Sequence, residues 1–106
     1  MEVSISARHG TLAKDAHDYI ERKIPKLAHL CDRINGVKVT VDLQPDAEDV
    51  DVELVVSEPR HVHASRSRDG TVFAAFDAAL GKMESQLRKQ KEKLHDHHAG
   101  GDKHLA

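Results

Sequence analysis

The sequence predicts an α+β protein: a two-layer sandwich with the element order β-α-β-β-β-α, in which a four-stranded sheet carries both helices on one face. Four short segments alternate apolar and polar residues, as half-buried strands do. Two longer segments repeat apolar residues every three or four positions, as amphipathic helices do. Because each element has a single apolar stripe, we expect the helices to cover one sheet face and to leave the other face in water.

The N-terminal part of the chain predicts one strand and one helix. Alternation over residues 2–7 indicates the strand, and helical periodicity over residues 12–34 indicates the helix. Thr11 is the expected N-cap, because its hydroxyl can accept a free N–H of the first turn. Pro25 lies inside the helix and predicts a kink, since it has no backbone N–H. Gly36 is expected to end the helix in a left-handed conformation.

The middle of the chain predicts three strands, over residues 37–43, 50–56 and 60–67. Short polar turns separate them, so they should form an antiparallel meander. In the last of these strands we expect Val62 and Ala64 to face inward. The N-terminal strand reaches the meander through a helix, which allows it to pair in parallel with one of the other strands.

The C-terminal part of the chain predicts a helix over residues 72–94 with Thr71 as its N-cap. The segment after this helix is polar, contains glycine and is rich in histidine. We therefore expect one domain over residues 1–95 and a flexible His-rich tail over residues 96–106.

The composition excludes several classes of protein. A single Cys rules out an internal disulfide and a Cys-based zinc site. Aromatic residues make up only 3% of the chain, which argues against an RNA reader built on stacked aromatics. The chain lacks an apolar run long enough for a membrane span, and its N-terminus lacks the apolar core of a signal peptide. We expect a cytoplasmic protein with no membrane partner.

The net charge of −2 conceals a segregation of charge along the chain. Residues 42–59 contain seven acidic residues and no Lys or Arg, whereas residues 1–41 and 60–98 are net basic. Such asymmetry within one domain indicates an anionic partner for the basic part. The acidic segment is expected to be a solvated edge that resists aggregation, and it lacks the spacing of a calcium loop.

Both predicted helices carry a basic stripe. On the C-terminal helix one arc contains no acid; its members are Lys82, Gln86, Lys89 and Lys93. On the first helix the outer stripe holds Arg22, Lys26, His29 and Arg33, and Lys23 lies at its apolar border. Two adjacent basic helices suit phosphates better than base edges, because such contacts position a backbone without reading sequence. The alternative is that these are ordinary solvated helix faces.

The sequence resembles the ribosome hibernation promoting factors, also called ribosome-associated inhibitor or ribosomal-subunit-interface proteins. The resemblance covers about residues 1–95 and is most specific in FAAFDAALGKMESQLRKQKEKL, residues 73–94, which adds Lys91 to the basic residues. The first helix matches through DYIERKIPKL and CDRINGVKV. At positions 17 and 85, where the family is usually basic, this chain has His17 and Ser85.

The resemblance implies a translation inhibitor of the short form that promotes ribosome hibernation in stationary phase and stress. It implies a monomer that binds the small ribosomal subunit in the channel for mRNA and tRNA, contacting ribosomal RNA with both helices. The acidic segment could then meet basic ribosomal-protein tails. The candidate RNA-binding residues are Arg22, Lys23, Lys26, Arg33, Lys82, Gln86, Lys89, Lys91 and Lys93.

Two other functions stay open. Two helices on a small sheet also occur in double-stranded-RNA-binding domains, so a general structured-RNA-binding module is one alternative. The other is a His-mediated metal-binding or protein-interaction module, since the chain has nine His, among them His61 and His63 on one strand and His95, His97, His98 and His104 in the tail. Metal-site and catalytic motifs are missing. We therefore expect no enzyme activity, no cofactor, no bound metal and no small-molecule substrate, and we expect Cys31 to be a small core residue.

Overall fold

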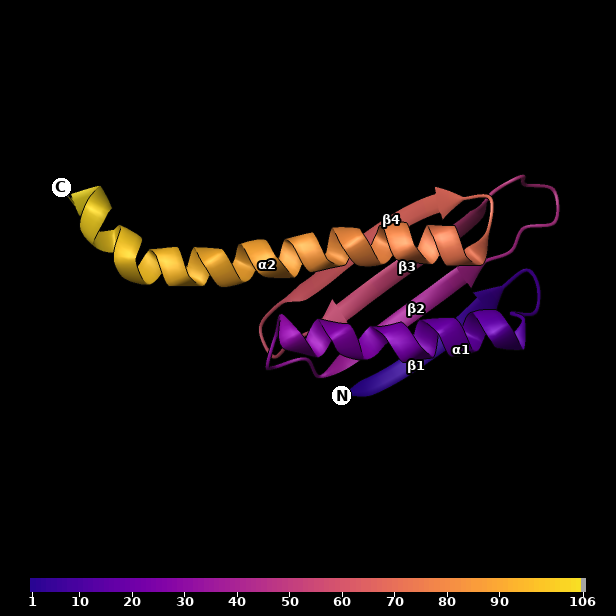
Figure 1. Cartoon of the computed structure of the whole chain (residues 1–106), viewed down its shortest axis with the longest axis horizontal. Helices are drawn as coiled ribbons and strands as arrows, with labels where there is room; N and C mark the ends of the chain where they lie inside the picture. The colour runs from indigo at the N-terminus through magenta and orange to yellow at the C-terminus, as the bar shows by residue number, and fades with distance from the viewer. Residues whose placement is uncertain (106) are drawn as a thin grey trace.

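The structure is a computed structural model that describes the backbone of residues 1–105 and the side chains of residues 1–93. Its helices lie on one face of a single sheet, as the alternating and helical patterns predict (Figure 1). The elements in chain order are β1 (Glu2–Arg8), α1 (Lys14–Lys23), the 3-10 helix η1 (Ile24–His29), β2 (Gly36–Asp42), β3 (Val50–Ser57), β4 (Val62–Asp69) and α2 (Val72–Leu105). The predicted α+β class and the order β-α-β-β-β-α are confirmed.

The sheet has the strand order β1-β2-β3-β4. Strand β1 pairs in parallel with β2, and β2, β3 and β4 form an antiparallel meander. The parallel pair is possible because α1 and η1 carry the chain back across the sheet between β1 and β2. The predicted topology is therefore confirmed, and it leaves β1 and β4 as the two edge strands.

The hydrophobic core lies between the helices and the inner face of the sheet. Its largest members are almost fully buried: Ile20, Ile24, Leu27, Val39, Leu54, Phe76, Met83 and Leu87. Each such side chain contributes about 1.5–3 kcal/mol by leaving water. Because the central strands β2 and β3 supply most of the sheet's buried residues, the core fixes their register and the position of both helices above them.

The first helix is shorter than its apolar period predicts. Helix α1 ends at Lys23, and the chain continues as η1 instead of one kinked helix over residues 12–34. The reason is Pro25, which cannot donate the backbone hydrogen bond that the α-helix needs at this position. The tighter 3-10 turn still buries Ile24 and Leu27, so the apolar pattern persists although the helix type changes.

The predicted N-cap and C-terminal residues of this helix are both wrong. Thr11 is not the N-cap: α1 begins at Lys14 after an extended Ala13, and no side chain caps it. Asp15 instead accepts a hydrogen bond from the backbone N–H of Ala16, at 2.9 Å. Gly36 has no positive φ, because it is the first residue of β2 and pairs with Glu2. A β-carbon at Gly36 would lie 3.3 Å from the Glu2 carbonyl oxygen, so the tight strand pairing explains the glycine.

Strand β4 starts later than expected and shows its opposite face to the core. The Glu58 N–H donates to the His61 carbonyl, so residues 60 and 61 belong to the turn and not to the strand that the sequence predicts over 60–67. Val62 is 70% exposed and Ala64 is exposed, so the prediction that they face inward is wrong. Ser65 pairs with the buried Leu54, and residues opposite each other share a face. Ser65 is buried and polar, which its hydroxyl tolerates by donating to the Ala79 carbonyl oxygen at 2.7 Å.

Helix α2 begins where the sequence predicts. The Thr71 hydroxyl accepts a hydrogen bond from the Ala74 N–H at 3.1 Å, which confirms Thr71 as the N-cap. The helix continues beyond the expected end at residue 94, to Leu105. Once a helix has begun, each added residue forms one more backbone hydrogen bond, so the helix can extend beyond the last residue of its apolar stripe. Side chains of the predicted flexible tail, residues 96–106, lie outside the described residues, and the domain limit at residue 95 stays a prediction.

The two threonines before the helices provide a matched test of capping. We expect Thr71→Ala to lower the free energy of unfolding by about 1 kcal/mol, because an N–H of the first turn loses its acceptor. We expect Thr11→Ala, at the position that does not cap, to change it by less than about 0.5 kcal/mol. Urea denaturation of both variants measures the difference. Equal losses would contradict the capping assignment.

Candidate nucleic-acid interface

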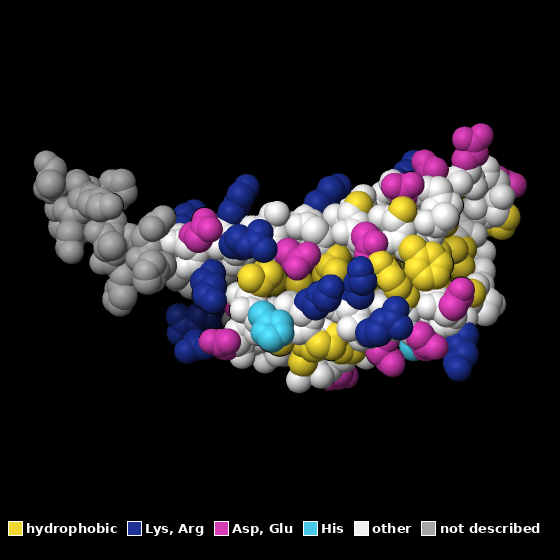
Figure 2. Space-filling model, in the orientation of Figure 1, with side chains coloured by type: hydrophobic (Ala, Val, Ile, Leu, Met, Phe, Trp, Pro, Cys, Tyr) yellow, Lys and Arg dark blue, Asp and Glu magenta, His cyan; other side chains and the backbone are white. Residues whose placement is uncertain are grey.

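The predicted RNA-binding residues fall into three groups on the structure. They are Arg22, Lys23 and Lys26 on α1 and η1; Arg33 and Lys91 around one hollow beside α2; and Lys82, Gln86, Lys89 and Lys93 on α2. Figure 2 shows Lys and Arg side chains over both helices, with Asp and Glu side chains among them and hydrophobic side chains along the seam between the helices. The cations thus surround the helical layer rather than forming one continuous ridge.

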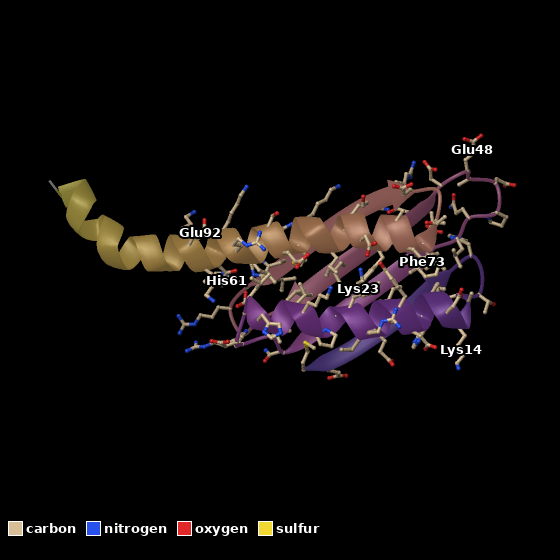
Figure 3. All side chains as sticks on the ribbon, viewed as in Figure 1. Lys14, Lys23, Glu48, His61, Phe73 and Glu92 are labelled. Carbon is tan, nitrogen blue, oxygen red and sulfur yellow. The ribbon has the colours of Figure 1, made fainter. Side chains whose placement is uncertain are left out.

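Lys23 belongs to a polar joint between the helices. The Tyr19 hydroxyl donates to both carboxylate oxygens of Asp77, at 2.8 and 2.7 Å. The Lys23 ammonium lies 4.6 Å from the Tyr19 ring centroid and 3.4 Å from Asp77 Oδ1, in the seam that Figure 3 shows. Its interaction with Tyr19 raises the pKa of Lys23 despite partial burial, and Asp77 adds to this. Lys23 therefore stays charged, but its ammonium already interacts with Asp77 and the Tyr19 ring within the protein.

Arg22 and Lys26 are the exposed cations of the first helical segment. The Arg22 guanidinium lies 5.8 Å from the Tyr19 ring centroid, so one aromatic ring holds cations of α1 in position. Lys26 stays exposed although its backbone belongs to the 3-10 helix η1 rather than to a continuous α-helix. Both side chains are therefore available to a ligand above the helical layer.

Arg33 and Lys91 line a hollow between the segment after η1 and the side of α2. The same hollow is lined by Cys31, Glu58 and Gln90, among other residues. The sequence does not reveal that Arg33 lies near Lys91, because Arg33 is in a loop that reaches α2 only through the tertiary fold. The structure thus brings together two predicted RNA-binding residues from different elements.

The Glu58 carboxylate, which lines this hollow, connects three segments of the chain through hydrogen bonds. Glu58 is 9% exposed and accepts hydrogen bonds from Cys31 Sγ at 2.8 Å and from His63 Nε2 at 2.5 Å. Burial opposes ionisation of Glu58, but the hydrogen bonds from Cys31 and His63, with help from Gln90, outweigh it and lower its pKa. Burial, and then the bond to Glu58, raises the pKa of Cys31, so the thiol keeps the proton that it donates. Cys31 is half-buried against the core, as a small core residue would be.

The basic stripe of α2 faces the edge strand β4. Lys82 Nζ donates to the Arg66 carbonyl oxygen and Gln86 Nε2 donates to the Ala64 carbonyl oxygen, each at 2.8 Å. Helical periodicity places Lys89 on the same side of α2. This stripe therefore lies on the side of α2 that faces away from α1, and two of its members also bind backbone atoms of β4.

The sequence pattern did not single out two further arginines that lie beside the basic stripe of α2. Arg66 and Arg68 lie on β4, and together with Lys82 they line a hollow at the sheet edge. The sequence does contain a signal, because the two arginines alternate with small residues and so share one strand face. Their proximity to Lys82 depends on how α2 crosses β4, which the alternation does not encode.

Comparison with known proteins assigns the family. Residues 3–95 match the family model described as Sigma 54 modulation protein / S30EA ribosomal protein. The chain belongs to this family. The S30EA family comprises non-enzymatic ribosome hibernation factors, whose functions are ribosome binding and translation regulation.

Two relatives of the S30EA chain illustrate its similarity in sequence. It is 32% identical over 93 residues to the ribosome hibernation promoting factor of Azotobacter vinelandii, covering 88% of this chain and 85% of that protein. It is 29% identical over 97 residues to the ribosome hibernation promoting factor of Escherichia coli strain K12, covering 92% of this chain and 100% of that protein.

Two solved structures share the fold. A ribosomal subunit interface protein from Coxiella burnetii superposes with a TM-score of 0.79 at 16% identity, covering 87% of this chain and 99% of that one. The Protein Y N-terminal domain of Thermus thermophilus superposes with a TM-score of 0.73 at 24% identity, covering 84% and 98% of the two chains. The S30EA fold is thus preserved where few residues are identical.

The described residues contain neither a cluster of metal-ligating side chains nor a helix that could span a membrane. Their side chains include no group of three or more His, Cys, Asp and Glu residues placed to hold a metal ion. The rings of His61 and His63 lie 6.2 Å apart, and His63 is bound to Glu58. The tail histidines lie outside the described side chains. Within the described residues, no helix combines the length and apolar character of a membrane span.

Proposed function

We propose that this chain binds the small ribosomal subunit and occupies its channel for mRNA and tRNA, so that idle ribosomes are held inactive under stress. Membership of the S30EA family supports the ribosome as the partner. A relative in fold carries the name ribosomal subunit interface protein, which is consistent with binding between the subunits. The mechanism is steric exclusion, and it needs no chemical step by the protein.

The observation that carries this proposal is the distribution of exposed cations over the helical layer. Arg22 and Lys26 stand on one side of the seam, and Lys89 and Lys93 stand on the far side of α2. Lysine and arginine at these positions would hold phosphates without reading bases. The turn between β2 and β3, which carries Asp46, Glu48 and Asp49, projects from the end of the sandwich away from the C-terminal part of α2 and would be repelled from the same RNA (Figure 1).

A salt series tests the electrostatic mechanism. We expect the association constant with ribosomes to fall by roughly 0.7–0.9 log units per phosphate contact for each log unit of salt. Co-sedimentation of the full chain with small subunits at several salt concentrations measures the slope. Affinity that is unchanged between low and physiological salt would contradict binding through phosphates.

Competition with plain duplex RNA separates the proposal from general RNA binding. The topology resembles that of double-stranded-RNA-binding domains, which recognise duplexes by shape. A ribosome-specific protein that is bound to ribosomes should be displaced by added free small subunits. It should not be displaced by an equal mass of unrelated duplex RNA. Equal displacement by both would favour a general structured-RNA-binding module.

A further inference from the structure

Three cations from two elements meet at the β4 edge of the sheet. Arg66 and Arg68 on β4 and Lys82 on α2 line a hollow together with Ser67 and Asp51. The side chains of Arg66 and Arg68 are 67% and 71% exposed. This group lies beside the basic stripe of α2 and continues it onto the sheet.

Asp51 holds the two arginines from below. Arg66 Nε lies 3.0 and 3.2 Å from the two carboxylate oxygens of Asp51, and a terminal nitrogen of Arg68 lies 3.6 Å from one of them. The Asp51 side chain is only 13% exposed, so it lies beneath the guanidinium groups that it orients. The hydrogen bond from Arg66 lowers the pKa of Asp51, which keeps this carboxylate charged at neutral pH.

The arrangement leaves donors free for a ligand. Arg66 contacts Asp51 through Nε, and among the described side chains its two terminal nitrogens have no other hydrogen-bond partner. Lys82 uses one of its three N–H donors on the Arg66 carbonyl oxygen, which fixes the ammonium beside the strand. Planar guanidinium groups fixed by a carboxylate are well suited to bind phosphate oxygens.

Acidic residues limit the extent of this surface. Glu53 pairs with Arg66 across the strands, and Asp42 is close enough to influence it. On the side of the β2–β3 turn the arginines border a hollow lined by Glu48 and Asp49. The cationic surface is therefore confined to the side of Arg66 and Arg68 that faces Lys82.

We propose that Arg66, Arg68 and Lys82 bind the phosphodiester backbone of ribosomal RNA, extending the interface from α2 around the β4 edge. This inference rests on the proposed function, because it adds contacts to the same ribosomal complex. The rival explanation is that the arginines only neutralise the acidic segment. In that case their loss would change stability and would leave the salt dependence of ribosome binding unchanged.

The test compares the double variant Arg66→Gln/Arg68→Gln with the parent in ribosome co-sedimentation over a salt series. We expect about tenfold weaker binding and a slope reduced by about 1.5, since two phosphate contacts are lost. The matched control is Arg8→Gln/Lys38→Gln, which removes two exposed cations from β1 and β2, the two strands that do not pair with β4. Thermal unfolding of each variant confirms that it is folded.

Each outcome separates the inference from the proposed function. If Lys89→Glu/Lys93→Glu loses ribosome binding while Arg66→Gln/Arg68→Gln keeps the parental slope, the inference is overturned and the proposed function stands. If both variants bind like the parent, the proposed function itself fails. An equal loss in the Arg8→Gln/Lys38→Gln control would show that only net charge matters, and would also overturn the inference.

Discussion

Reversing Lys89 and Lys93 to glutamate is expected to weaken ribosome binding about 10- to 100-fold at physiological salt. Both side chains are exposed on α2, on an arc that contains no acid. Each reversal removes a phosphate contact and adds repulsion, so the salt slope should also fall by roughly 1.5. Co-sedimentation with small subunits measures both quantities.

Lys89 and Lys93 are better targets than Lys82 for this test. The Lys82 ammonium is bound to the Arg66 carbonyl oxygen, so its reversal would also disturb the β4 edge. The control Lys14→Glu/Lys38→Glu changes the net charge equally at exposed positions away from the α2 stripe. A second control, Arg88→Glu, reverses a cation of the same helix that lies four residues from both Glu84 and Glu92, on an arc with alternating charges. Equal losses in all variants would reject the assignment of this face.

Replacing Glu58 by glutamine is expected to lower the free energy of unfolding by about 1–3 kcal/mol at neutral pH. The charged carboxylate accepts hydrogen bonds from Cys31 and His63. The neutral amide of glutamine would accept a hydrogen bond more weakly through its oxygen, and its NH2 group would face a side chain that is itself a donor. Urea denaturation measures the loss. The exposed Glu48, in the turn between β2 and β3, provides the control: Glu48→Gln should change stability by less than about 0.5 kcal/mol.

The same variant predicts how stability depends on pH. The folded-state pKa of Glu58 is lowered, so its contribution is fully present above the pKa of an unfolded glutamate, about 4.3. The contribution is lost as the pH falls through the lower pKa of the folded state. The stability difference between the parent and Glu58→Gln should therefore be constant from neutral pH to about pH 5 and should shrink in acid. A difference that grows in acid would contradict the role of the ionised carboxylate.

The strand pattern was sufficient to predict most of the fold. Val39 and Leu54 alternate with polar neighbours, and this alternation fixed which faces of β2 and β3 are buried. The pattern failed in β4, where Ser65 is buried while its neighbours Ala64 and Arg66 and the apolar Val62 are exposed. Ser65 faces inward because pairing with Leu54 and a hydrogen bond to Ala79 outweigh its intrinsic polarity, and neither partner is adjacent in sequence.

The candidate interface was predictable only element by element. Helical spacing placed Lys82 and Gln86 on one face, and both contact β4, because these positions depend on one helix alone. Spacing could not reveal that the group faces β4, or that Arg33 lies near Lys91. Pro25 predicts a kink in one helix, whereas in the structure the α-helix ends there and a 3-10 turn follows that still buries Ile24 and Leu27.

Lys82 and Gln86 of α2 affect how readily the edge strand β4 can pair with a second copy of the protein at high concentration. An edge strand invites another copy to add its own strand and so start a growing chain of molecules. Lys82 and Gln86 already donate to the outward carbonyl oxygens of Arg66 and Ala64, so an incoming strand would compete with these side chains for the two acceptors. The β4 edge is therefore a poorer template for polymerisation than a bare strand would be.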